Sequence, residues 1–335
     1  MRIAIDAMGG DHAPGACVEG ALAAAAEYPD TVIVLVGDTA RLEPLLQGRR
    51  PANLELRHAS EVIEADDEPV KAVRRKKDSS MVVAGRMVKE GEVGAMISAG
   101  NTGALMTTGL LVVGRMKGIE RPALAPMLPT LDGEGVLALD LGANMDATAQ
   151  QLVQYAIMGS IYRMKVHGMK KPRVGLLNVG TEAMKGNEVT KAAFPLLETA
   201  PVDFVGNVES RDVLQKPCDV LVCDGFAGNI MLKSMEGTAS AVFSVLKAEF
   251  TRTWYTKLAA ALVKNGLGRF RSKMDYTEHG AAPLLGLEGL VLKSHGSSNA
   301  TAFKNAVRQA RTALSNDLVR SISVEISKGS EWESP

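Results

Sequence analysis

The chain has 335 residues, of which 46% are hydrophobic and 4% aromatic, so it can build one large domain or two ordinary ones around an aliphatic core. Its 38 Lys and Arg residues balance 38 Asp and Glu residues, and this zero net charge argues against a dedicated nucleic-acid-binding protein. No apolar stretch approaches the roughly 20 residues of a membrane-spanning helix, which excludes an integral membrane protein.

The three cysteines, Cys17, Cys218 and Cys223, are an odd number without metal-ligand spacing or a preceding signal-peptide pattern. We therefore expect a cytoplasmic protein with reduced thiols and no disulfide framework. Cys223 ends an apolar run with no basic partner near it in the sequence, so we expect a buried thiol and no covalent catalysis.

Short β-branched runs recur along the chain and alternate with helical patterns, of which residues 16–27, 102–116 and 148–164 are the clearest. This alternation predicts βαβ units and a mostly parallel sheet. Fully apolar runs such as "VIVLV" indicate strands that are buried on both faces. The predicted strands are residues 2–8, 31–37, 54–59, 93–100, 135–142, 173–180, 202–208 and 219–225.

Polar loops that contain glycine follow several of these strands, at residues 99–103, 141–146, 178–188, 224–229 and 294–300. In an open α/β sheet, ligands bind outside the carboxyl ends of the strands, where helix N-termini offer unpaired N–H groups. A helix cap would explain any one loop alone, whereas all five together predict a shared crevice. The candidate ligand-binding residues are Asn101, Thr102, Gly103, Asn144, Glu182, Asp224, Gly225, Gly228, His295, Gly296, Ser297 and Ser298.

Two side chains in these loops are candidates for direct chemistry. Lys185 precedes a predicted helix, where its ammonium could contact an anion held at the helix N-terminus. Asn229 is poorly suited to a helix interior and could present its amide to a ligand that the neighbouring glycines let approach. Each has an alternative without a ligand: a solvated lysine for Lys185 and an N-cap for Asn229.

Other cofactor chemistry has less support. The segment "SHGSSNA" matches neither a Walker A loop nor a dinucleotide fingerprint, which argues against ATP and NAD. Asp11 and His12 follow the first strand, but the five histidines of the chain are not paired at metal-ligand spacing. We expect neither a metal nor a cofactor.

The segment after Asn229 contains two helical patterns in succession and no strand, which predicts a helical hairpin over residues 229–275 standing off the sheet. Basic residues flank one apolar face of the second helix, as in helices that lie at a membrane surface. A helix in a dimer core would show the same pattern, and both roles are compatible. The apolar face is Trp254, Leu258, Ala261 and Leu262, and the flanking residues are Arg252, Lys257 and Lys264.

The order of these motifs resembles that of the bacterial phosphate acyltransferases over nearly the whole chain. One position departs from the family pattern: a second carboxylate often follows the Glu of the "GTE" motif, whereas Ala183 follows Glu182 here. No acidic pair is therefore expected there, although Lys185 is in place. The matching segments are "MRIAIDAMGGDHAP", "DDEPVKAVRRKKDSSM", "SAGNTGALM", "LLNVGTEAMKGNE", "NVESRD", "DGFAGNIMLK" and "KSHGSSNATAF".

The resemblance implies a three-layer α/β/α fold with a large, mostly parallel mixed sheet, like that of isocitrate and isopropylmalate dehydrogenases and of phosphotransacetylases. It implies one domain of two lobes over residues 1–330, which forms a homodimer. It also implies direct attack of inorganic phosphate on the thioester of acyl-acyl carrier protein, giving acyl phosphate for phospholipid synthesis without a cofactor. Lys185 and Asn229 match positions regarded in the family as active-site residues.

The family also associates peripherally with membranes, which favours a hairpin tip that touches the inner face of the cytoplasmic membrane. The basic run at residues 71–77 could receive the acidic carrier protein, and a glycerol-3-phosphate acyltransferase is the expected downstream partner. Two alternatives stay open. One is a phosphate acetyltransferase that uses coenzyme A and needs no exposed amphipathic tip, and the other is a non-catalytic membrane scaffold that binds carrier protein.

Overall fold

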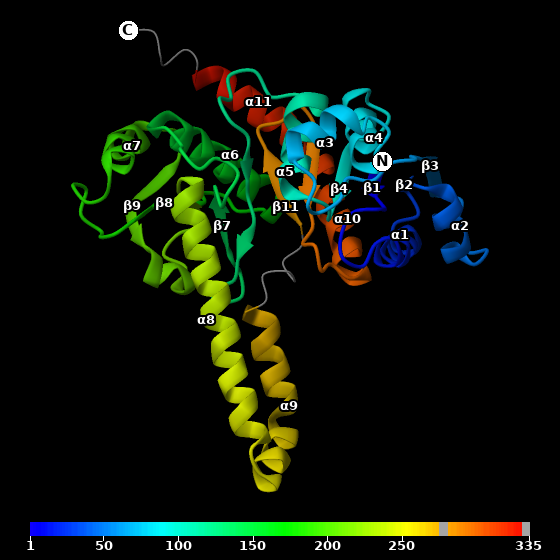
Figure 1. The fold of residues 1–335 in the computed structure, drawn as a ribbon. Coiled ribbons are helices and arrows are strands. Elements are labelled where there is room, and N and C mark those ends of the chain that lie inside the picture. Colours follow the sequence, from blue (N-terminus) through cyan, green and yellow to red (C-terminus); the bar gives the residue numbers. More distant parts are fainter. Residues whose placement is uncertain (275–280, 330–335) are drawn as a thin grey trace.

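A computed structural model describes residues 1–274 and 281–329, and its strands form two sheets with helices on the faces of each (Figure 1). The first sheet has seven strands in the order β3-β2-β1-β4-β12-β11-β5, parallel from β3 to β12 and antiparallel at β11 and β5. Its strands are β1 Arg2–Asp6, β2 Val32–Gly37, β3 Leu54–His58, β4 Ala95–Ser98, β5 Ala123–Leu124, β11 Ala282–Leu285 and β12 Leu290–Lys293.

The second sheet has five strands in the order β6-β7-β10-β8-β9, of which only β6 runs antiparallel to its neighbour. The chain passes from β5 in the first sheet to β6 in the second through Ala125 and Pro126 alone. The strands are β6 Met127–Leu128, β7 Val136–Leu139, β8 Arg173–Asn178, β9 Asp203–Glu209 and β10 Val220–Val222.

Strand residues alternate between two cores because successive side chains point to opposite faces of a sheet. In the first sheet, Ile3 and Ile5 pack on the side of α1 and α10, whereas Ala4 packs on the side of α4. We call the seven-stranded sheet with its helices the first lobe. Its helices are α1 Gly15–Glu27, α2 Thr39–Leu46, α3 Pro69–Arg75, α4 Ser80–Lys89, α5 Thr102–Thr108 and α10 Ala300–Ser315.

The second lobe is the five-stranded sheet with the helices on its faces. Leu137 and Leu139 face α6, whereas Val136 and Ala138 face the start of α8. Helix α6 also contacts α10 and α11, and one continuous core holds residues of both sheets. The helices are α6 Ala149–His167, α7 Glu188–Thr199, α8 Gly225–Thr251, α11 Leu318–Gly329 and the short 3-10 helix Ser210–Gln215.

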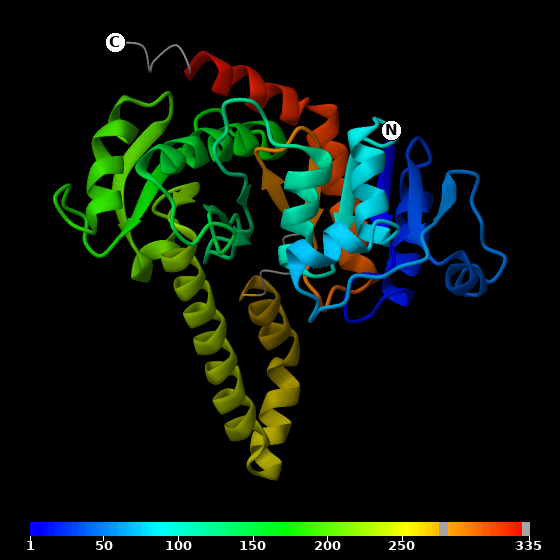
Figure 2. The ribbon, with the colours of Figure 1, turned by 45° about the horizontal axis from the view of Figure 1, so that its top comes forward.

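Helices α8 and α9 (Trp254–Met274) form the predicted hairpin, which projects away from both lobes in each view (Figures 1 and 2). The 27 residues of α8 span about 40 Å at 1.5 Å per residue. Only the residues near its N-terminus are buried, namely Gly225, Gly228 and Met231. Among the described residues, no helix is long and apolar enough to cross a membrane.

The structure confirms the α/β class, the mostly parallel sheets and all eight predicted strands, and it corrects three details. The antiparallel strands β5, β6 and β11 were not expected, because two of them have two residues and the third contains a proline. Helix α5 ends at Thr108 and continues as a π-helical turn, Gly109–Val113. Helix α8 begins at Gly225, so Asn229 is not its N-cap.

Candidate active site

Three polar loops of the second lobe lie side by side because they follow neighbouring parallel strands. Strands β7, β10 and β8 are adjacent, and adjacent strands lie about 4.8 Å apart. Asn144 lies in the loop after β7, Lys185 lies in the loop after β8, and Asn229 lies in the first turns of α8, which begins shortly after β10. The topology therefore brings the two candidate catalytic residues to the carboxyl ends of neighbouring strands in the same sheet.

Two amides that the sequence analysis did not single out hold the Lys185 loop. Asn178 Nδ2 donates to the Lys185 carbonyl oxygen at 3.1 Å, and Asn207 Nδ2 donates to the Glu182 carbonyl oxygen at 2.8 Å. The Lys185 backbone N–H donates to the same Glu182 oxygen at 3.0 Å. The loop backbone is thus anchored, while the Lys185 and Glu182 side chains are exposed to solvent. The exposed Lys185 ammonium can therefore bind an anion without first breaking a contact with the protein.

Asn229 lies in the first turns of α8, half-buried against the loop that follows β7. A Cβ atom built on Gly142 would lie 3.6 Å from Asn229 Cγ and 3.7 Å from its Oδ1. Gly142 has a φ of 127°, a conformation that residues with a side chain rarely adopt. The glycine therefore lets the loop pass directly against the Asn229 amide.

The other residues of the "DGFAGN" segment have structural roles. Asp224 is the N-cap of α8, since its Oδ1 accepts from the Ala227 backbone N–H at 2.8 Å. A Cβ atom on Gly225 would lie 2.6 Å from the Asn144 carbonyl oxygen, and one on Gly228 would lie 2.2 Å from that of Asp140. These glycines leave room for protein backbone, and their contact with a ligand stays a prediction.

The side-chain amides of Asn144 and Asn101 also bind protein groups, and their contact with a ligand stays a prediction. Asn144 Nδ2 uses both of its hydrogens, on the Pro122 carbonyl oxygen at 2.7 Å and the Tyr155 hydroxyl at 2.9 Å. Asn101 Nδ2 lies 3.0 Å from the Ala65 carbonyl oxygen, and its Oδ1 caps α5.

Asp140, which was not among the candidates chosen from the sequence, directly follows β7, and its side chain is fully buried. Its Oδ2 accepts from the Asn144 backbone N–H at 2.5 Å, and its Oδ1 accepts from that of Leu124 at 3.3 Å. Burial raises the pKa of the Asp140 carboxyl to about 6, against the effect of the backbone N–H groups that it accepts from. The signal in the sequence was an aspartate directly after the apolar run "VLAL".

The first lobe gathers the two remaining loops at the carboxyl edge of its own sheet. Asp11 N–H donates to the Gly296 carbonyl oxygen at 2.8 Å, and Ser294 N–H donates to that of Ser98 at 2.9 Å. Buried Asp6 joins this set, because its carboxylate accepts from the Ser98 hydroxyl at 2.7 Å. The structure thus groups the five predicted loops as two sets, one per sheet; their union in a single crevice stays a prediction.

The histidine loop of the first lobe is folded on itself. His295 Nδ1 lies 2.7 Å from Ser297 Oγ and accepts from the Ser297 backbone N–H at 3.2 Å. Ser298 is buried, and its N–H donates to the His295 carbonyl oxygen at 3.0 Å.

Thr102 and Gly103, which follow β4, have different surroundings. Thr102 is exposed, whereas Gly103 lies beneath a proline: a Cβ atom there would come within 2.6 Å of Pro69 Cγ. Gly103 is therefore required for packing, and the expectation that it binds a ligand has no structural support.

No cluster of three or more potential metal ligands occurs within residues 1–274 and 281–329. The prediction that Cys223 is buried is confirmed. Burial raises the pKa of its thiol well above the ordinary value, so the nucleophilic thiolate is not formed at neutral pH.

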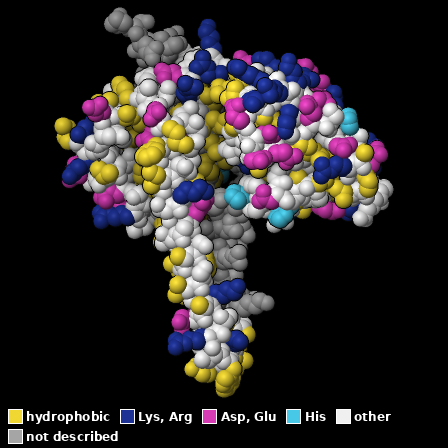
Figure 3. Space-filling model, viewed as in Figure 1, with side chains coloured by type: hydrophobic (Ala, Val, Ile, Leu, Met, Phe, Trp, Pro, Cys, Tyr) yellow, Lys and Arg dark blue, Asp and Glu magenta, His cyan; other side chains and the backbone are white. Residues whose placement is uncertain are grey.

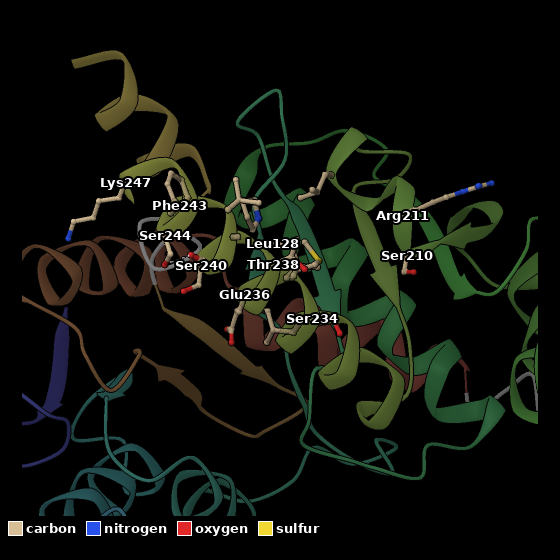
Figure 4. A pocket seen from close by; sticks show the side chains of 16 residues that line it. Leu128, Ser210, Arg211, Ser234, Glu236, Thr238, Ser240, Phe243, Ser244 and Lys247 are labelled. Carbon is tan, nitrogen blue, oxygen red and sulfur yellow. Dashed lines mark hydrogen bonds between the residues drawn. The ribbon is translucent and has the colours of Figure 1, made fainter. Parts of the chain in front are cut away.

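A separate apolar pocket of about 820 Å³ lies between α8, the 3-10 helix Ser210–Gln215 and the end of β6 (Figure 4). Met235, Val242 and Phe243 contribute apolar surface from α8, and Leu128 and Leu214 face them. Neither Asn229 nor Lys185 lines this pocket, and Leu232 is the first residue of α8 that does. It is therefore distinct from the edge that holds Asn229 and Lys185.

The chain is similar to known proteins over its whole length. Residues 1–321 match the family described as "Fatty acid synthesis protein". The chain is 59% identical over 334 residues to a "Phosphate acyltransferase" of Brevibacillus brevis, with all of both chains covered. It is 56% identical over 330 residues to one of Geobacillus thermodenitrificans, covering 98% of this chain and 100% of the relative.

Among solved structures, the fold is similar to that of a phosphotransacetylase from Streptococcus pyogenes, with a TM-score of 0.58, 18% identity and 94% of each chain covered. A branched-chain phosphotransacylase from Enterococcus faecalis gives a TM-score of 0.56 at 14% identity, covering 94% of this chain and 99% of the other. At these identities, the likeness concerns the fold alone.

Proposed function

Because the chain belongs to the phosphate acyltransferase family of fatty acid synthesis proteins, we propose that it transfers a long-chain acyl group from acyl-acyl carrier protein to inorganic phosphate. The family establishes the enzyme class, an acyltransferase that uses phosphate. The carrier-protein donor, the acyl phosphate product and the residue roles below belong to the proposal. The observation that best supports the residue roles is that Lys185, in the loop after β8, and Asn229, in the first turns of α8 after β10, follow neighbouring parallel strands.

In the proposed reaction, a phosphate oxygen attacks the thioester carbonyl carbon and forms a C–O bond. The resulting tetrahedral oxyanion collapses, the C–S bond breaks, and the carrier thiolate leaves and takes a proton from water. Phosphate is already a nucleophile, so the enzyme has to position it and stabilise the oxyanion. The exposed Lys185 ammonium binds phosphate or the oxyanion, and the Asn229 amide donates an N–H to one of them.

The hairpin supports the proposal that the enzyme works at the inner face of the cytoplasmic membrane. Leu258 and Leu262 are 60% and 83% exposed, Trp254 is 78% exposed, and Ala261 is exposed as well. Figure 3 shows hydrophobic side chains gathered at the far end of the hairpin, with basic side chains above them. Arg252 and Lys257 flank the described part of this tip, whereas the Lys264 side chain lies outside what the structure describes. An acyl phosphate with a long chain would be delivered there to a membrane enzyme such as a glycerol-3-phosphate acyltransferase.

Two further surfaces have proposed partners. The apolar pocket along α8 suits a second copy of the chain, because a homodimer would cover the exposed Val242 and Val245. Lys71, Arg74, Arg75 and Lys77 are exposed on or next to α3, and such a basic surface would attract the acidic carrier protein.

The test is to incubate the purified protein with phosphate and either palmitoyl-carrier protein or acetyl-coenzyme A, and to trap acyl phosphate with hydroxylamine. We expect palmitoyl hydroxamate from the carrier-protein reaction. Product from acetyl-coenzyme A alone would select a phosphate acetyltransferase instead. No hydroxamate from either donor would overturn the enzymatic proposal and favour a carrier-protein scaffold.

A further inference from the structure

The carboxylate of Asp140 contacts three elements that meet at the proposed active site. Its oxygens accept the backbone N–H groups of Leu124 in β5, which belongs to the first lobe, and of Asn144 in the following loop. A Cβ atom on Gly225 would lie 2.9 Å from Asp140 Oδ2, so the carboxylate also packs against the first turn of α8. One buried charge thereby joins the edge of the first sheet, the 141–144 loop and the helix that carries Asn229.

The same loop lies against the Asn229 side chain. A Cβ atom built on Gly142 would be in van der Waals contact with the Asn229 amide, and the loop is held at Asn144 by the Pro122 carbonyl oxygen and the Tyr155 hydroxyl. The Asn144 carbonyl oxygen in turn accepts from the Gly225 N–H at 2.9 Å. The position of the Asn229 amide therefore depends on a loop whose backbone is folded around Asp140.

We propose that Asp140 is a positioning residue, which holds the Asn229 amide in its working orientation through the 141–144 loop. The inference rests on the proposed function, because it takes Asn229 to contact phosphate or the thioester. The ionised form of Asp140 is the one that can accept all of its backbone N–H groups, since a carboxylate is acceptor-only. An asparagine has the same shape but would place an NH₂ donor against some of these N–H groups.

Asp6 provides a matched control in the first lobe. It also ends a buried parallel strand, and its carboxylate accepts from the Ser80 and Ser98 hydroxyls at 2.6 and 2.7 Å and from the Met8 N–H at 3.2 Å. Both aspartates are at least 99% buried, and burial raises the pKa of each carboxyl. Asp6→Asn therefore reproduces the loss of a buried charge without disturbing the contacts of Asn229.

The experiment is a double-mutant cycle on the full chain, with kcat and the KM for phosphate measured by hydroxylamine trapping. Asp140→Asn should lower kcat on the order of tenfold or more, while Asp140→Asn added to Asn229→Ala should lower it by less than about twofold, because coupled residues are non-additive. The factors by which Asp6→Asn and Asn229→Ala each lower kcat should multiply in the double variant. The side-chain amide signal of Asn229 in an NMR spectrum should shift in Asp140→Asn and not in Asp6→Asn.

A milder pair keeps the inference testable where Asp140→Asn fails to fold. Tyr155 and Tyr162 are both buried on α6, but the Tyr155 hydroxyl contacts Asn144, whereas that of Tyr162 accepts from Gln309 Nε2 at 2.6 Å. Tyr155→Phe should move the Asn229 amide signal and lower kcat, and Tyr162→Phe should do neither.

The two failures can be told apart. Full activity of Asn229→Ala would remove Asn229 from the site and overturn the residue roles of the proposed function. An inactive Asn229→Ala, together with an unmoved Asn229 signal in Asp140→Asn or Tyr155→Phe, would overturn the positioning role of Asp140 alone. Multiplicative losses for Asp140→Asn and Asn229→Ala would also overturn it.

Discussion

Gly142 and Asn229 face each other across the edge of the second sheet, and the space for one carbon atom separates the loop backbone from the amide. Gly142→Ala would fill that space and also strain a backbone whose φ is 127°. Gly133→Ala is a matched control, because Gly133 has a φ of 85° and nothing within 4 Å of an added Cβ. Both variants should lower the thermal midpoint, but only Gly142→Ala should lower kcat. Equal kcat values in the two variants would contradict the contact.

Replacing Lys185 should remove catalysis without unfolding the protein. The side chain is exposed, so Lys185→Ala should leave the thermal midpoint unchanged while lowering kcat/KM by about 10²–10³, the loss expected for a group that stabilises transition-state charge. Lys191→Ala, at an exposed position on α7, should leave kcat/KM unchanged. Trapped acyl phosphate measures both; activity within twofold of the unaltered protein in Lys185→Ala would refute its role.

Charges at the hairpin tip should release the protein from membranes. Leu258→Glu with Leu262→Glu should abolish sedimentation with vesicles that contain anionic lipid, because the exposed apolar face is replaced by carboxylates. Leu111→Glu introduces a charge at a position that is 55% exposed in the first lobe and should leave sedimentation unchanged. Activity on soluble substrate should persist in all variants. Unchanged vesicle binding of the double variant would contradict membrane contact through the hairpin tip.

The oligomeric state should depend on the apolar surface of α8. Val242→Asp with Val245→Asp places charges on the exposed part of this helix and should convert a dimer into a monomer, as measured by light scattering during size-exclusion chromatography. The Leu111→Glu variant serves again as the control with an intact α8. A dimer of unchanged stability in the double variant would place the interface elsewhere.

Lys293 should make stability depend on pH in the alkaline range. Burial lowers the pKa of its ammonium to about 8, although Asp6 and Asp11 oppose the shift. Between that value and the ordinary 10.5, the unfolded chain binds a proton that the native protein has released, so the free energy of unfolding rises with pH. The buried cysteines oppose this trend, because their thiols stay protonated in the native protein at a pH where unfolded thiols ionise. Urea titrations from pH 7 to 10 should therefore show the free energy of unfolding of the unaltered protein rising relative to that of Lys293→Met. Parallel curves for the two proteins would contradict the lowered pKa.

Local patterns of apolar residues and helix-forming segments were sufficient to predict the α/β class, the eight main strands and the hairpin. The sequence also predicts Lys185 and Asn229 as candidate catalytic residues, whose motifs are contiguous. The division of the strands between two sheets followed from pairing between distant segments, such as β12 with β4, which no local pattern encodes. The same long-range pairing decided the roles of individual loop residues. Asn101, Asn144, Gly103, Gly225 and Gly228 were predicted to bind a ligand, and folding brings protein groups against the two side-chain amides and the Cα atoms of the three glycines. The role of Asp140 could not be predicted from local sequence, because it depends on the packing of β5, β7 and α8 around one carboxylate. A buried charge is stable only where folding brings hydrogen-bond donors to it, and here these include the Leu124 and Asn144 N–H groups.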